Sequence, residues 1–162
     1  MNGLDWLPFL AHSSQHPDIE AWLQHHDVKW RPSLRSMGNF HTFKAPGSKC
    51  GNGLTVYFSI SAKDDGYEVK TDGDFVLYRV NFNLLDDNTG VYTGELPLGV
   101  KAQDSREQVR QRLGQPARAH ESVDIYFVDQ LFYFFAFGEC MEYINAQLPS
   151  ARSRTTILGE PA

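Results

Sequence analysis

Histidine is the residue type of this chain whose spacing most suggests chemistry. Six histidines are present, His12 and His16 are four positions apart, and His25 and His26 are adjacent. On a helix, residues four apart share a face, and two imidazoles placed in this way can bind a metal ion. The chain has no HExxH motif, however, and His12 precedes the helix expected from residue 14. We therefore expect exposed or capping histidines and no metal site.

The two cysteines raise the question of a nucleophile. Cys50 or Cys140 could act as one if the fold brought it close to His41 or His120. Spacing does not test that arrangement, and Cys140 follows a Gly-Glu dipeptide within a strand-like segment, which favours packing. Neither cysteine belongs to a CxxC motif, so two ordinary thiols are favoured over a disulfide.

Motifs for cofactors and covalent catalysis are absent from the sequence. It contains no GxGxxG, GxxxxGK[ST] or GxSxG pattern, and the Asp-Gly-Asp at 72–74 lacks the other ligands of a calcium loop. We therefore expect a protein that uses no cofactor.

The negative charge is concentrated in the middle of the chain. Residues 63–97 hold three basic against eight acidic residues, which accounts for the net charge of −5. The acidic residues are Asp64, Asp65, Glu68, Asp72, Asp74, Asp86, Asp87 and Glu95. Such a segment repels nucleic acid phosphates and attracts a basic partner. The alternative is a set of solvated turns, because Asp and Gly are common turn residues.

Length and composition indicate one folded domain without a membrane span. The 162 residues are 41% hydrophobic and 13% aromatic, and no apolar run approaches the roughly 20 residues that a bilayer requires. The first 15 residues lack both the positive charge and the long apolar stretch of a signal peptide, so we expect a cytoplasmic protein.

The first half of the chain reads as one helix followed by strands. Apolar residues three and four positions apart predict a helix at 14–27, with Ser14 or His16 as its N-cap. Period-two alternation and turn residues predict strands at 39–45, 54–62 and 75–84, and a further strand at 91–96.

The second half repeats this order. Asp104 or Ser105 can cap a helix of about nine residues, which Gly114 and Pro116 end. Strands are predicted at 122–128, 131–137 and 140–148, with Asp-Gln and Gly-Glu at the hairpins between them. The aromatic run at 132–137 is typical of a strand buried on both faces; the alternative is an apolar pocket or a base-stacking surface.

These elements predict an α+β fold, with short helices packed on one face of an antiparallel sheet. The repeated order suggests two degenerate helix-plus-meander units, at 13–84 and 99–148, within one domain over residues 1–150. The small and polar residues at 151–162 predict a flexible tail.

The second helix and its flanks carry a resemblance to a known group of proteins. The sequence pattern that carries this resemblance has four parts. A Leu-Pro-x-Gly motif precedes the helix, a Ser-Arg-Glu-x-Val motif begins it, a Leu-Gly-x-Pro motif ends it, and a glycine lies in the last hairpin turn. They are Leu96, Pro97, Gly99, Ser105, Arg106, Glu107, Val109, Leu113, Gly114, Pro116 and Gly138. With these features, residues 5–148 resemble the immunity proteins encoded beside bacterial polymorphic or type VI secreted toxins.

The resemblance implies a protein that neutralises a cognate toxin, such as a nuclease, by occluding its active site or blocking its assembly. It implies no fixed contact residues, so these are argued from charge and aromatic character. The candidates are Asp64, Asp65, Tyr67, Glu68, Asp72, Asp74, Asp86, Asp87 and Tyr92. We expect a partner that is basic where it makes contact, and neither a nucleic acid nor a membrane.

The helix-plus-meander unit is also similar to the outer-membrane lipoproteins of the SmpA/OmlA type and to the β-lactamase inhibitory protein. None of these groups is catalytic, so the resemblance implies a protein that is not an enzyme. A non-enzymatic structural or assembly-factor domain is the alternative function. Those proteins are exported, whereas we expect neither a signal peptide nor a lipobox cysteine from this sequence.

Overall fold

The computed structural model describes residues 1–35 and 39–161. The first half contains η1 (Gly3–Phe9), α1 (Pro17–His25), β1 (Phe40–Lys44), β2 (Gly51–Ser59) and β3 (Val76–Asn83). The second half contains η2 (Pro97–Gly99), α2 (Arg106–Leu113), β4 (Arg118–Ala119), β5 (Val123–Val128), β6 (Leu131–Phe137), β7 (Met141–Gln147), α3 (Ala151–Ser153) and η3 (Arg154–Leu158).

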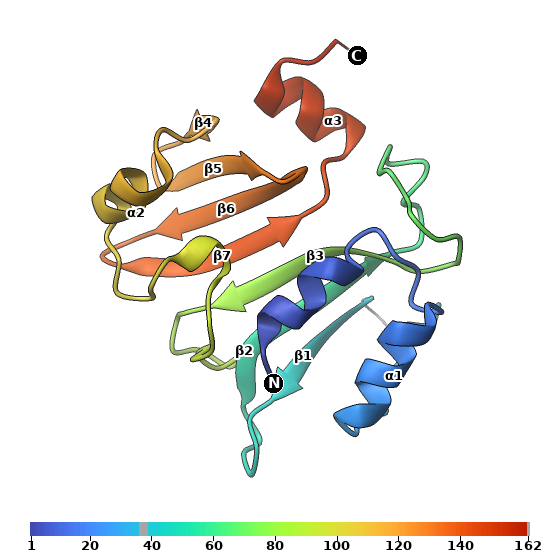
Figure 1. Ribbon diagram of the computed structural model, residues 1–162. Helices are drawn as coiled ribbons and strands as arrows, with labels where there is room; N and C mark the ends of the chain where they lie inside the picture. The colour runs from blue at the N-terminus through green and yellow to red at the C-terminus, as the bar shows by residue number, and fades with distance from the viewer. Residues whose placement is uncertain (36–38, 162) are drawn as a thin grey trace.

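Within the described residues, the strands form one seven-stranded antiparallel sheet in the order β1-β2-β3-β7-β6-β5-β4. Each half of the chain is a meander, and the last strand of each, β3 and β7, pair with one another (Figure 1). The two predicted helix-plus-meander units therefore meet near the centre of the sheet.

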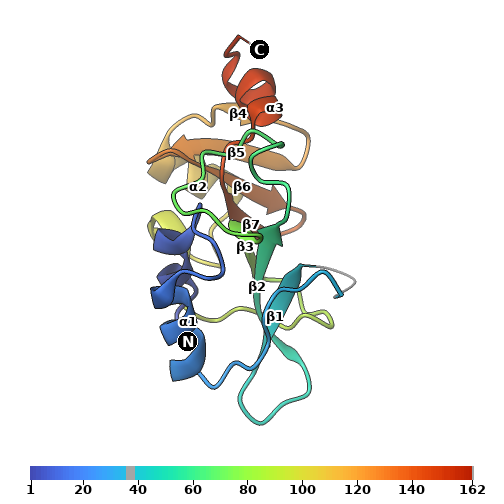
Figure 2. The ribbon, with the colours of Figure 1, turned by 90° about the vertical axis from the view of Figure 1, so that its right-hand side faces the viewer.

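One face of the sheet is covered by helices. In Figure 2, where the sheet is seen on edge, η1, α1 and α2 lie on the same side of it. They contribute Trp6, Ile19, Leu23 and Val109 to the core, and Leu10, the residue after η1, is buried with them. The strands contribute two cross-strand rows, Leu54–Phe82–Ile144–Phe135 and Val56–Val80–Ala146–Tyr133. The predicted α+β class, with short helices against an antiparallel sheet, is confirmed.

Local capping bonds fix the helix starts. His16 caps α1, because its Nδ1 accepts the N–H of Asp18 (3.2 Å). Ser105 caps α2 in a capping box: its Oγ accepts the N–H of Gln108 (3.2 Å), and its own N–H donates to Gln108 Oε1 (2.8 Å). Gly114 follows α2 with a φ of +83°, as the sequence predicts. Helix α1 is shorter than the predicted 14–27.

The prediction of a strand at 91–96 is wrong. Tyr92 is held there by its side chain: the N–H of Gly3 donates to its hydroxyl (2.8 Å), and the hydroxyl donates to the Glu95 carbonyl oxygen (3.1 Å). Long-range contacts to η1, invisible in a local pattern, thus set this segment.

The C-terminal segment expected to be a flexible tail contains α3 and η3. Ser150 and Ser153 exchange hydrogen bonds that cap α3. Arg118 of β4 donates to the Thr156 carbonyl oxygen, and Arg154 forms an ion pair with Glu68 (2.9 Å). These contacts tie residues 151–158 to the rest of the fold.

Both hairpins of the second meander lie where the sequence places them. Asp129 and Gln130 connect β5 to β6 with φ values of +48° and +65°. Residues 138–140 connect β6 to β7, so Cys140 lies in a turn and is exposed, not packed within a strand as expected. Cys50 is also free and exposed.

Candidate protein-binding surface

The sheet face opposite the helices carries polar and aromatic side chains. Directly opposed residues of antiparallel strands share a face. Tyr57, Arg79 and Gln147 form one row across β2, β3 and β7, and Thr55, Asn81 and Asn145 form the next. Both rows alternate with the two core rows, so they lie on the side that η1, α1 and α2 do not cover.

Three tyrosines and an arginine gather on this face. We name Tyr57, Tyr67, Tyr78 and Arg79 the tyrosine–arginine cluster. The Arg79 Cζ atom lies 3.9 Å from the centre of the Tyr57 ring and 5.7 Å from that of Tyr78. Tyr67 packs against Tyr78 with ring centres 5.6 Å apart. Phe40, which is 51% exposed, extends the cluster, because its ring centre lies 5.6 Å from that of Tyr57.

A β-bulge explains why Tyr78 belongs to this cluster. Tyr57 pairs with Arg79 but Phe58 pairs with Leu77, so Tyr78 has no partner in the ladder. A bulge changes the direction of a side chain and increases the local twist. Strict alternation along β3 would instead have placed Tyr78 on the core face with Val80.

Among the residues that the structure describes, Arg79 has no acidic partner. None of the ion pairs of the described residues involves it, and its buried Nε atom has no hydrogen-bond partner. Its guanidinium is held by the tyrosine rings alone, among the contacts of the described part of the chain. A buried N–H without a partner is costly, so this arrangement calls for an explanation.

The connection between β2 and β3, residues 60–75, carries most of the predicted contact residues, and we name it the acidic loop. It holds Asp64, Asp65, Tyr67, Glu68, Asp72 and Asp74. Asp64, Asp72 and Asp74 line an open groove of about 380 Å³ together with Ile60, which is 57% exposed. Tyr67 belongs both to the loop and to the tyrosine–arginine cluster.

Part of the charge of the acidic loop is compensated within the fold. Lys63 pairs with Asp72, and its hydrogen bond lowers the pKa of that carboxyl group. Glu68 pairs with Arg154 (2.9 Å), and Asp65 accepts a hydrogen bond from the Ser61 hydroxyl (2.8 Å). The loop is therefore a mixed surface in which Asp64 and Asp74 are exposed without such pairing among the described contacts.

Asp86, Asp87 and Tyr92 lie apart from this loop. They follow β3, whereas the acidic loop precedes it, so the eight residues of the strand separate the two groups (Figure 1). Asp87 accepts hydrogen bonds from the Thr89 side chain and N–H, which lower its pKa and fix the turn. Tyr92 is only 4% exposed. Its burial removes Tyr92 from the surface that could anchor a partner.

The sequence analysis missed Tyr57, Tyr78 and Arg79. Tyr57 and Arg79 occupy polar positions of two neighbouring alternating strands, and that signal could have found them. The position of Tyr78 depends on the bulge, which no local pattern in the sequence indicates.

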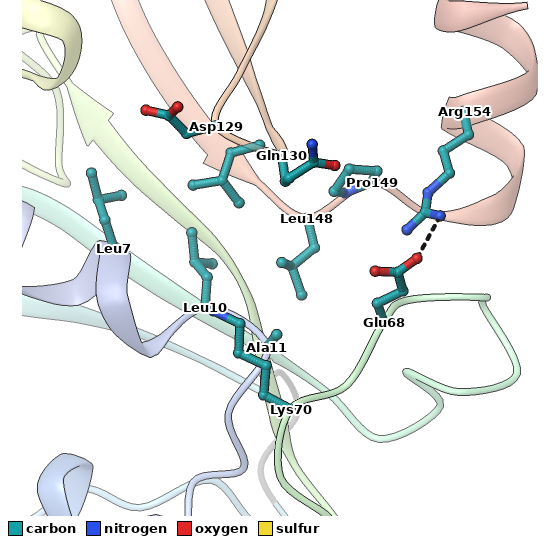
Figure 3. Close-up of a pocket in the computed structure, with 11 residues that line it drawn as sticks. Leu7, Leu10, Ala11, Glu68, Lys70, Asp129, Gln130, Leu148, Pro149 and Arg154 are labelled. Carbon is teal, nitrogen blue, oxygen red and sulfur yellow. Dashed lines mark hydrogen bonds and ion pairs between the residues drawn. The ribbon is translucent and has the colours of Figure 1, made fainter.

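A second hollow lies between η1 and the β5–β6 turn. Its volume is about 230 Å³, and Leu7, Leu10, Leu148 and Pro149 form its apolar part. Figure 3 shows the Glu68–Arg154 ion pair at one side of it. Its lining brings together no arrangement of a nucleophile and a base.

Neither a metal-binding group nor a membrane-spanning helix is found in the described ranges. Residues 1–35 and 39–161 contain no cluster of three or more His, Cys, Asp and Glu side chains able to hold a metal ion. The His12 and His16 rings lie 4.6 Å apart, but they are only a pair. None of the helices in these ranges is long and apolar enough to cross a bilayer.

Comparisons with protein-family models, curated proteins and solved structures find no significant match to this chain.

Proposed function

We propose that this protein is an immunity protein that binds a cognate bacterial toxin, such as a type VI or contact-dependent effector, and neutralises it by occluding its active site. One observation carries the proposal: Tyr67 joins the acidic loop to the tyrosine–arginine cluster, so charge and aromatic area form one continuous surface.

The chemistry of this surface suits a protein partner. Tyrosine and arginine are enriched among the residues that dominate binding energy at protein interfaces. Acidic residues beside them accelerate the encounter with a basic protein, and this effect weakens as salt rises. A toxin that cleaves nucleic acid needs a basic cleft, which would complement the acidic loop.

Capture followed by a growth assay tests the proposal. The tagged protein is incubated with lysate of its source organism, washed at low and then high salt, and the retained protein is identified. Expressed alone in a bacterial host, the retained protein should arrest growth, and coexpression of the immunity protein should restore it. A retained protein that leaves growth unaffected contradicts the proposal; recovery of envelope-assembly proteins would favour the alternative of an SmpA/OmlA-like structural domain.

The same partner tests the acidic loop. Combining Asp64→Asn, Asp72→Asn and Asp74→Asn should slow association and flatten its dependence on salt. The control combines Glu107→Gln, Glu121→Gln and Glu139→Gln, three exposed residues of the second half, and removes the same charge. Equal effects of the two triple variants would show that net charge alone matters and would remove the acidic loop from the contact surface.

A further inference from the structure

We propose that Arg79 is a recognition point for a single carboxylate, from an Asp or Glu side chain of the partner protein that inserts against the open sheet face. This inference deepens the proposed function and rests on it for the identity of the partner. The recognition chemistry itself follows from the surroundings of Arg79.

The Arg79 guanidinium is positioned without being neutralised. The Tyr57 ring covers one side of the guanidinium, with its centre 3.9 Å from the Arg79 Cζ atom, and none of the ion pairs of the described residues involves Arg79. The Nε atom is buried and has no hydrogen-bond partner among these residues, so a partner protein would have to contact the terminal nitrogens of the guanidinium. The two terminal nitrogens of a guanidinium present a pair of N–H donors that matches the two oxygens of a carboxylate, and stacking leaves that pair free. A partner carboxylate would therefore pair with Nη1 and Nη2 of Arg79, which, unlike Nε, are not buried without a partner.

The neighbours of Arg79 fit a carboxylate rather than an apolar group. Gln147 lies opposite Arg79 on β7, and Asn81 and Asn145 form the adjacent row, so amide donors are grouped around the guanidinium. The strand positions of these two rows, from β2 to β7, carry no other formal charge. Tyr57, Tyr67 and Phe40 can exclude water from the contact, which strengthens a charge-assisted hydrogen bond.

The charge of the whole chain selects a protein carboxylate over a nucleic acid phosphate. A polyanion would bring many phosphates toward a chain of net charge −5 and toward the acidic loop. One Asp or Glu on an otherwise basic protein meets no such repulsion, because its basic neighbours would face Asp64 and Asp74. The surface thus combines general attraction by the loop with one specific contact at Arg79.

A random peptide library displayed on phage tests this inference without the natural partner. Selection on the immobilised protein should enrich peptides that contain Asp or Glu. Arg79→Gln should abolish the enrichment, whereas the control Arg152→Gln, an exposed arginine of α3, should retain it. Arg79→Lys keeps the charge without the paired donors and should restore the enrichment only in part.

The best peptide then allows a double-mutant cycle. Replacing its acidic residue by the matching amide should weaken binding to the natural protein roughly tenfold or more, and should have little further effect on Arg79→Gln. Melting temperatures close to that of the natural protein would show that the variants are folded. Lack of acidic enrichment, its persistence in Arg79→Gln, or selective binding of oligonucleotides through Arg79 would each overturn the inference. A failed growth assay with intact acidic enrichment would instead contradict the immunity function alone.

Discussion

Asp124 shows how one buried carboxylate organises the second half of the fold. It lies on β5 with 0% of its surface exposed, and its oxygens accept hydrogen bonds from Arg106 (2.7 Å) and Arg110 (2.7 Å) of α2. Burial raises the pKa of Asp124, but the hydrogen bonds from the two arginines outweigh it and leave the pKa below its ordinary value. The two ion pairs of Asp124, with Arg106 and Arg110, tie the polar helix α2 to the sheet.

Asp124→Asn should therefore lower the free energy of unfolding by about 2 to 4 kcal/mol, because it leaves two arginines without their buried partner. Urea unfolding at neutral pH measures this loss. Because the pKa in the folded state lies below the ordinary 3.8, the stabilisation is present above about pH 4 and is lost as pH falls through the folded pKa. Asp72→Asn, at an exposed ion pair, is the control and should leave the midpoint unchanged. Equal losses from the two variants would contradict this account.

Elements whose signals are local could be predicted from the sequence, and elements set by distant contacts could not. The caps His16 and Ser105 bond within three residues, so their helix starts are visible in the sequence. The segment around Tyr92 depends on Gly3, 89 positions away. The candidate surface divides in the same way: the acidic loop stands out in composition, whereas the contact of Tyr67 with Tyr78 requires the fold.

The turn between β5 and β6 uses residues that suit its backbone poorly. Asp129 and Gln130 both have positive φ values, +48° and +65°, and Gln has no special tolerance for this conformation. Asp129→Asn combined with Gln130→Gly supplies the preferred Asn-Gly pair and should stabilise the protein by about 0.5 kcal/mol or more. Thermal unfolding should give a higher melting temperature. A lower one would mean that the native side chains of this turn contribute more than its backbone strain costs.

Three half-buried histidines, His12, His26 and His41, should make the first half of the fold sensitive to mild acid. Burial lowers the pKa of His12, His26 and His41, and smaller electrostatic contributions from the neighbouring residues His16, His25 and Lys44 lower it further. The unfolded chain therefore binds more protons below about pH 6.5, and the free energy of unfolding should fall as pH drops from there.

His41→Phe tests this pH dependence. His41 stacks on Trp30 with ring centres 4.9 Å apart and meets Phe43 edge-on, contacts that a Phe ring can keep. The urea midpoint of this variant should fall less between about pH 7.5 and about pH 5.5 than that of the natural protein. An identical fall would show that His41 does not contribute to the acid sensitivity.

At the scale of the whole molecule, the two helix-plus-meander units share one core. Ile144 of β7 is fully buried and lies between Phe82 of β3 and Phe135 of β6, so it contacts both halves. The core cluster likewise includes residues from η1 and α1 through to β7. A core that spans the β3–β7 junction should make the halves unfold together, although each resembles a unit of its own.

The tryptophans allow this cooperativity to be measured, because all three, Trp6, Trp22 and Trp30, belong to the first half. Ile144→Ala removes buried volume from the second half and should cost about 3 kcal/mol. If the halves are coupled, urea transitions followed by tryptophan fluorescence and by far-ultraviolet circular dichroism should move to lower urea by the same amount. Ile60→Ala, at a side chain that is 57% exposed, is the matched control and should move neither. A fluorescence transition that stays in place while the dichroism curve divides into two steps would show that each unit folds independently, and the prediction of one domain over residues 1–150 would then be wrong.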